Sequence, residues 1–141
     1  MKKKIAIGAD HAGYLLKAEL IMAYGDRFEF VDFGTNGPES VDYPDFAHPV
    51  ANEVEQGKAD FGVLICGSGN GINMTANKHA GVRAALCWEE EIAKLARQHN
   101  DANVLTLPAR FVDIEKGKRI LEAFMSEGFE GGRHQNRINK I

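Results

Sequence analysis

The chain has 141 residues, of which 44% are hydrophobic, and this length and composition exclude a disordered chain or a scaffold that depends on disulfide bonds. Its 17 basic and 20 acidic residues leave a net charge of −3, so there is no global reason to expect a nucleic acid or an anionic membrane as a partner. No apolar run approaches the roughly 20 residues that a membrane-spanning helix needs.

In chain order, apolar residues alternate between short runs typical of buried strands and stretches with helical spacing. We expect a strand at residues 5–8, a helix at 12–24, a strand at 28–33, a helix at 45–56, a strand at 61–66, a helix at 70–78, a strand at 82–87, a helix at 89–99, a strand at 103–107 and a helix at 113–126. This alternation predicts an α/β fold, a single-domain three-layer Rossmann-like sandwich with a five-stranded parallel sheet. The commonest order of five such strands is 2-1-3-4-5.

The N-terminus and the cysteines favour a cytoplasmic protein. Met1 and three lysines lead directly into the first strand, without the long apolar region and cleavage site of a signal peptide. The two cysteines, Cys66 and Cys87, could form one disulfide, but a mildly acidic, glycine-rich chain fits a reducing compartment better. We therefore expect one soluble domain over residues 1–141.

The last eleven residues differ from the rest of the chain because they contain Arg133, Arg137 and Lys140 but no acid. One interpretation is a solvated, frayed tail, which is the usual behaviour of a terminus. The other is a basic arm that brings two arginines, four residues apart on one helical face, to an anion.

The predicted strand order places a crevice between the carboxyl ends of the first and third strands, where open α/β sheets bind ligands. Asp10 and His11 follow the first strand, whereas Cys66 ends the third and a glycine-rich turn follows it. An acid, an imidazole, a thiol and a glycine loop would then face one crevice.

The glycine-rich turns do not match nucleotide motifs. Tyr14 and Leu15 stand where a P-loop needs Lys and Ser or Thr, and residues 67–72 lack the last glycine of a dinucleotide fingerprint. Ile72 stands where a cysteine phosphatase needs arginine. What remains is a cradle of backbone N–H groups at the start of a helix, suited to an oxyanion.

Each candidate side chain also has a purely structural interpretation. A cysteine that ends a buried run is often inert, but Cys66 directly precedes a helix N-terminus, which lowers a thiol pKa and favours a reactive group. Cys87 lacks such a setting and is expected in the core. Asp10 could cap the following helix instead of binding a ligand. His11 and His99 could each be structural histidines instead of functional ones. The spacings of His48, His79 and His134 suggest no ligands, and no pair of residues predicts a metal site, so we expect no metal or other cofactor.

Five segments together resemble one enzyme family. They are GADHAG (8–13), DYPDFA (42–47), CGSGNGINMTANK (66–78), RQHNDANVL (97–105) and FEGGRHQNRI (129–138). The chain is similar over nearly its whole length to the type B ribose-5-phosphate isomerases, the family that also holds the galactose-6-phosphate isomerase subunits. The resemblance implies a metal-free aldose–ketose isomerisation through an enediolate, with ribose 5-phosphate and ribulose 5-phosphate as the interconverted sugars.

The resemblance also implies residue roles. Cys66 would be the base that takes the proton from the carbon beside the carbonyl. Some relatives use a glutamate as the base instead, but Ile72 stands at that position here, so the chain resembles the cysteine type. His99 would be the acid that opens the furanose ring. The substrate-binding residues would be Asp10, His11, Gly67, Ser68, Gly69, Asn70, Gly71, Asn100, Arg110, Arg133 and Arg137.

Within that set, backbone N–H groups of residues 67–71 and the Ser68 hydroxyl would stabilise the oxyanion. Asp10 would bind sugar hydroxyls, and Asn100 would hold the enediolate end. The three arginines and His11 would grip the phosphate.

The family is dimeric and sometimes tetrameric, so the resemblance implies a homodimer or tetramer whose sites are completed across the interface. We expect residues 99–110 to be the donated stretch. Two alternatives stay open: an isomerase of a six-carbon 6-phosphate sugar such as allose or galactose 6-phosphate, and a non-catalytic sugar-phosphate-binding subunit. Neither nucleic acid nor membrane is expected as a partner.

Overall fold

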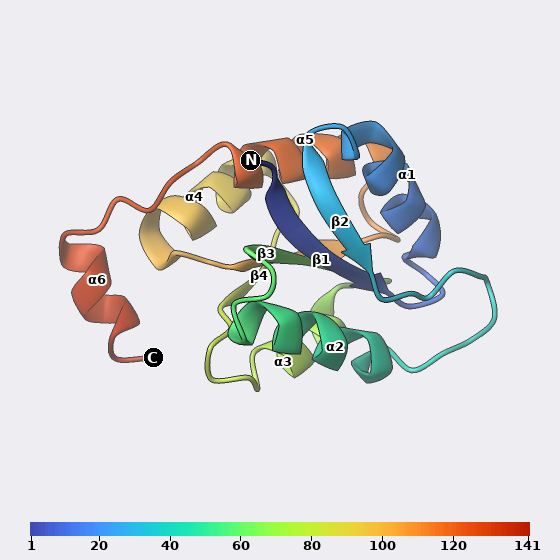
Figure 1. The fold of residues 1–141 in the computed structure, drawn as a ribbon, viewed down its shortest axis with the longest axis horizontal. Coiled ribbons are helices and arrows are strands. Elements are labelled where there is room, and N and C mark those ends of the chain that lie inside the picture. Colours follow the sequence, from blue (N-terminus) through green and yellow to red (C-terminus); the bar gives the residue numbers. More distant parts are fainter.

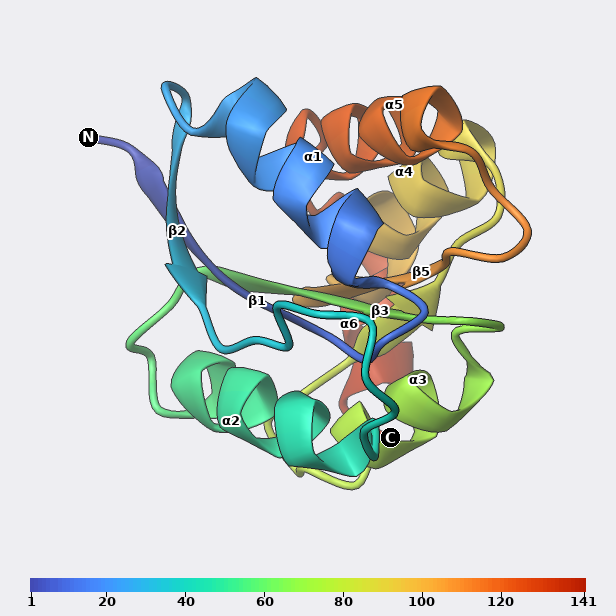
Figure 2. The same cartoon turned by 90° about the vertical axis from the view of Figure 1, so that its right-hand side faces the viewer.

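The computed structural model describes all residues 1–141, and its centre is a five-stranded, all-parallel sheet. The elements are β1 (Lys3–Ala9), α1 (Tyr14–Tyr24), β2 (Phe28–Asp32), α2 (Pro44–Glu55), β3 (Phe61–Cys66), α3 (Asn70–Ala76), β4 (Ala84–Leu86), α4 (Glu90–Asn100), β5 (Val104–Pro108), α5 (Ile114–Met125) and α6 (Arg133–Ile138). Helices α1, α4 and α5 cover one face of the sheet, and α2 and α3 cover the other (Figure 2). The predicted three-layer α/β sandwich is therefore confirmed.

The strand order is β2-β1-β3-β5-β4, so the expected order 2-1-3-4-5 is wrong at its last two positions. The physical reason is burial. All five residues of β5 are buried, as an interior strand requires, whereas β4 has only three residues and each is half-buried. The short strand takes the edge, where fewer groups lose contact with water. Strands β1 and β3 are adjacent, as expected, so the predicted crevice still lies between their carboxyl ends.

Side chains alternate between the two faces of the sheet and build two cores. Ile5 and Ile7 of β1 belong to the larger core under α1, α4 and α5, while Ala6 between them points to the smaller core under α2 and α3. On β3, Ile65 faces the larger core and Cys66 the smaller. The Cys66 side chain therefore leaves the sheet toward α3, the helix that follows its own loop.

The C-terminal segment forms helix α6, so the interpretation of a frayed tail is wrong. The helix lies beside the end of α4 and away from the strands (Figure 1). Arg133 and Arg137 both belong to it, four residues apart. None of the helices is long and apolar enough to cross a membrane.

Candidate active site

The turn after β1 holds Asp10 at the mouth of the crevice. The backbone N–H of Asp10 donates to the carbonyl of Ile65 on β3, and its side-chain Oδ1 accepts from the N–H of Ala12 at 2.9 Å. One carboxylate oxygen therefore shapes the turn before α1. It does not cap the helix, as the alternative interpretation had it, because the N-cap is Gly13 and no side chain caps it. The second oxygen has no hydrogen-bond partner within the chain, and it remains available to a ligand.

His11 is held in one tautomer by the long loop between β2 and α2. Its Nδ1 accepts a hydrogen bond from the backbone N–H of Val41 at 3.2 Å. A ring nitrogen that accepts carries no proton, so the proton of the neutral imidazole is on Nε2. His11 consequently presents a donor, the kind of group that binds an anion.

That loop is anchored by a buried ion pair. Lys17 on α1 is 1% exposed, and its Nζ lies 2.8 Å from both carboxylate oxygens of Asp32 and from Oδ1 of Asn36. The backbone of Gly34 and Thr35 exchanges hydrogen bonds with Ala9 at the end of β1. The loop that fixes His11 is therefore tied to the strand that carries it.

Cys66 ends β3 as a free thiol, 5% exposed, and the glycine loop begins at once. The loop turns sharply because Gly69 has φ +80°, a conformation that suits glycine. Ser68 supports it, since its Oγ accepts from the N–H of Asn70 at 3.2 Å. Successive backbone N–H groups and a thiol thus share one short turn.

Two larger side chains of the same chain close over this loop. A Cβ placed on Gly67 would lie 3.1 Å from Nη1 of Arg110, and one placed on Gly71 would overlap the ring of Tyr43. Arg110 is placed there because its backbone N–H donates to the carbonyl of Gly67. Sequence reasoning missed Tyr43 as a candidate, although it stands directly before Pro44 in a segment already noted.

Cys87 is the second cysteine and has a different environment. Its side chain is fully buried in the larger core, and this burial raises the pKa of the thiol to about 12. Cys87 is therefore protonated at neutral pH, and its expected place in the core is confirmed. No disulfide joins it to Cys66.

His99 and Asn100 lie near the amino ends of the strands, whereas Cys66 lies at the carboxyl end of β3. They end α4, a helix that runs back toward the start of β5, and Arg83 Nε donates to the Asn100 carbonyl there. In the parallel register, Val104 pairs with Gly62, so Cys66 lies four residues, or about 13 Å, further along β3. The structure does not bring His99 to the thiol of its own chain.

The basic arm lies with His99. The N–H of Glu130 donates to the carbonyl of Gln98, and the rings of His99 and His134 stack with centroids 4.2 Å apart. Arg133 and Arg137 accompany them on α6. Burial, followed by the proximity of His99 and Arg133, lowers the pKa of His134.

The candidate residues therefore form two groups. The first lies at the carboxyl edge of the sheet and contains Asp10, His11, Cys66, residues 67–71 and Arg110. The second lies around the end of α4 and contains His99, Asn100, Arg133 and Arg137. A cavity of about 520 Å³ opens beside the second group, with Asn100, Arg83, Ala102 and Ile141 among its lining residues.

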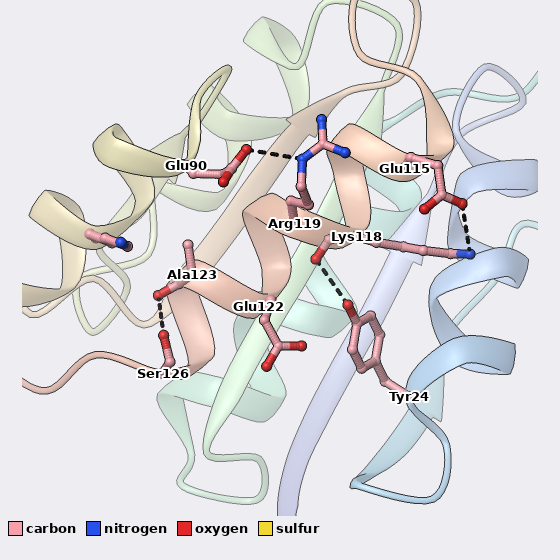
Figure 3. Close-up of a pocket in the computed structure, with 9 residues that line it drawn as sticks. Tyr24, Glu90, Glu115, Lys118, Arg119, Glu122, Ala123 and Ser126 are labelled. Atoms are coloured by element: carbon pink, nitrogen blue, oxygen red, sulfur yellow. Dashed lines mark hydrogen bonds and ion pairs between the residues drawn. The ribbon is translucent and has the colours of Figure 1, made fainter.

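A separate groove of about 420 Å³ runs between α1, α4 and α5 and touches neither group (Figure 3). Four of its charged side chains form two ion pairs: Arg119 contacts Glu90 at 3.1 Å, and Lys118 contacts Glu115 at 3.3 Å. The Tyr24 hydroxyl donates to the Lys118 carbonyl. These features are those of a solvated helix surface, and the groove offers no cluster of reactive groups.

Comparison with known proteins supplies the family. The family model described as Ribose/Galactose Isomerase matches residues 5–141. The chain belongs to this family. Ribose-5-phosphate isomerase B of Escherichia coli is 48% identical over 99% of this chain and 94% of the relative. The putative sugar phosphate isomerase YwlF of Bacillus subtilis is 41% identical over 98% and 94%.

Solved structures of ribose/galactose isomerases have the same fold. A ribose 5-phosphate isomerase from Thermotoga maritima superposes with a TM-score of 0.96 at 45% identity, over 99% of this chain and 97% of that one. Ribose-5-phosphate isomerase B from Mycoplasma genitalium, solved with bound ribulose-5-phosphate, superposes with a TM-score of 0.93 at 46% identity, over 99% and 94%. The expected reaction class, isomerisation, is confirmed.

Proposed function

We propose that the chain interconverts D-ribose 5-phosphate and D-ribulose 5-phosphate through an enediolate, without a metal ion or other cofactor. The observation that carries the proposal is the position of Cys66, a free thiol at the end of β3, directly before the glycine loop and on the strand next to the one that Asp10 follows. The Mycoplasma genitalium relative, which holds ribulose-5-phosphate, supports the same sugar for this chain.

In the proposed reaction the Cys66 thiolate takes the proton from C2 of the open-chain aldose. The electron pair of that C–H bond forms the C1–C2 double bond, and the carbonyl oxygen becomes an oxyanion. Backbone N–H groups of residues 67–71 and the Ser68 hydroxyl stabilise that charge as it develops. The thiol then returns the proton to C1 while a proton moves from O2 to O1, and the ketose results. Asp10 binds the sugar hydroxyls.

The second group must reach this site from another copy of the chain. His99, the proposed ring-opening acid, and Asn100, the proposed holder of the enediolate end, lie at the wrong edge of their own sheet. We therefore propose a homodimer or a tetramer in which the second copy supplies them. Arg110 packs on Gly67 of its own chain, so we propose that the donated stretch, expected to span residues 99–110, ends before Arg110.

The phosphate would accordingly be held by both copies. His11 and Arg110 belong to the chain that supplies Cys66, whereas Arg133 and Arg137 come with His99 on the basic arm. A remote anchor of this kind orients the reacting carbon, and its binding energy contributes to the rate. We propose that residues 1–141 act as one isomerase domain, with the arm at 129–141 part of the site.

We also propose that the enzyme works in the cytoplasm, where a reducing environment keeps the Cys66 thiol free. The partner is a small sugar phosphate. Neither a nucleic acid nor a membrane is part of the proposal.

The second candidate function is isomerisation of a six-carbon 6-phosphate sugar, which the description of the matching family as ribose and galactose isomerases favours. An apolar pocket distinguishes two substrates that differ by one carbon by only about 1–3 kcal/mol, so both the five-carbon and the six-carbon sugars are tested.

The experiment is an assay of purified protein with a chelator present. Ribose 5-phosphate is the substrate, allose and galactose 6-phosphates compete, and Cys66→Ala runs in parallel. Turnover of ribose 5-phosphate that is lost in the variant supports the proposal. If only a six-carbon sugar is turned over, the proposed mechanism stands and the proposed substrate changes. Tight binding of all three sugars without turnover would identify a binding subunit and overturn the proposal.

A further inference from the structure

Three metal-ligating side chains converge next to the end of α4, although they are far apart in the sequence. They are His99 on α4, Glu130 in the segment after α5, and His134 on α6, which lies beside α4 (Figure 1). Glu130 Oε1 is 3.8 Å from Nε2 of His99 and 3.6 Å from Nε2 of His134. All three ligand atoms lie within 4.8 Å of one another.

These distances are close to those of a zinc site. Zinc bound tetrahedrally at about 2.0–2.2 Å from nitrogen and oxygen holds its ligand atoms about 3.4 Å apart. Each distance from a histidine to Glu130 therefore needs to shrink by only a few tenths of an ångström, whereas the two histidine nitrogens, which lie within 4.8 Å of each other, have further to move. The two imidazoles, which stack at an interplanar angle of 12°, must also turn so that their lone pairs meet at one point.

The surroundings show which ligand can make that turn. His134 is held, since its side chain is only 10% exposed, and the backbone of Glu130 is tied to Gln98. The side chain of His99 is 40% exposed and has room to rotate. Water reaches the cluster from this side, so an ion would keep a fourth position open.

A second group with the same residue types provides a contrast. His48, His79 and Glu55 lie together between α2 and the end of α3, but His48 Nδ1 is only 2.7 Å from His79 Nε2. Two nitrogens at that distance share a proton in a hydrogen bond and leave no pair of lone pairs aimed at one ion. The convergence on a single carboxylate oxygen distinguishes the cluster on α4 and α6.

We propose that His99, Glu130 and His134 bind one Zn²⁺ ion reversibly and that the ion inhibits the isomerase by occupying the imidazole of His99. The inhibition rests on the ring-opening role proposed for His99, whereas the binding of the ion does not. Arg133 and Arg137 on the same helix repel a cation and weaken its hold. The site is therefore a reversible one and not a structural zinc centre.

The binding test uses full-length protein with Cys66→Ser, because a free thiol would itself bind zinc. Zn²⁺ alone is titrated in competition with a chromophoric chelator. We expect one ion per chain, and a loss of affinity of at least tenfold in Glu130→Gln and in His134→Asn. His48→Gln is the matched control and should bind zinc like its parent. Glu130 is half-exposed, so the first variant will fold. Equal affinity in all four proteins would overturn the site.

The inhibition test uses protein with Cys66 intact and measures ribose 5-phosphate turnover as Zn²⁺ is added, each protein relative to its own zinc-free rate. Half-inhibition should need at least tenfold more zinc in Glu130→Gln, and a chelator should restore the rate. Unchanged inhibition in that variant would mean that zinc acts through the thiol, and the inhibitory role would fall. Absence of turnover before zinc is added would count against the proposed function and leave the binding result standing.

Discussion

Lys17 and Asp32 form a salt bridge in which the lysine is almost completely buried and the carboxylate is one-third exposed, with 2.8 Å between Nζ and each carboxylate oxygen. The pair joins α1 to the last residue of β2, where the loop that holds His11 begins. A buried charge that loses its partner is costly, so the pair contributes to stability and to the geometry of the site together.

We expect Lys17→Met to lower the free energy of unfolding by about 2–3 kcal/mol. This loss is smaller than the loss expected when a fully buried ion pair is broken, because water reaches Asp32. Urea unfolding measures this change. Lys4→Met is the matched control, since its pair with Glu29 is exposed on both sides and should contribute no more than about 0.5 kcal/mol. Equal losses in the two variants would show that the buried pair has no special role.

Substitutions of Cys66 and Arg137 should affect different kinetic constants. Cys66→Ala removes the proposed base, which acts only in the transition state, so kcat should fall by about 100- to 10,000-fold with substrate binding mostly retained. Arg137→Ala removes a phosphate ligand and should mainly raise KM. Steady-state kinetics together with substrate titration separate the two effects. Near-normal kcat in Cys66→Ala would remove this residue from the mechanism.

A hybrid dimer tests whether two chains build each site. Cys66→Ala and His99→Asn homodimers should both be inactive. The hybrid of the two variants, isolated with two affinity tags after co-expression, has one intact site and one doubly altered site, so it should recover about half the wild-type activity. An inactive hybrid would show that His99 does not serve the Cys66 of another chain.

Glu55 predicts a dependence of stability on acid. The N–H of Gly81 and, after it, the imidazole of His79 lower the pKa of this carboxyl below its ordinary value near 4.5. A group whose pKa falls on folding stabilises the native state above its unfolded pKa and loses that effect as the pH drops through the folded value. Glu55→Gln should therefore be less stable than the wild type at neutral pH, and the gap should close under acid.

Unfolding curves at neutral pH and at a series of acidic values measure that gap. Glu19→Gln serves as a control, because the Glu19 side chain, on helix α1, makes no hydrogen bond or ion pair. A gap that stays constant with pH would contradict the assignment to the Glu55 carboxylate.

Several features followed from local pattern. The alternation of apolar runs predicted every strand and helix of the sandwich, because burial on one or both faces imposes a period that the chain itself displays. The adjacency of β1 and β3 placed Asp10, His11 and Cys66 at one edge. The order of β4 and β5 did not follow, since it depends on which strand competes better for the interior of the sheet.

The sequence by itself determined the family, the fold class and the residue types of the site. Only the tertiary structure decided which residues share a place: Arg110 and Tyr43 cover the glycine loop of their own chain, while His99 lies at the far edge of the sheet. It also brought His99, Glu130 and His134 together, which no spacing along the chain announced. The physical reason is that periodicity reports burial of each element, whereas contacts between distant elements arise from how those elements pack.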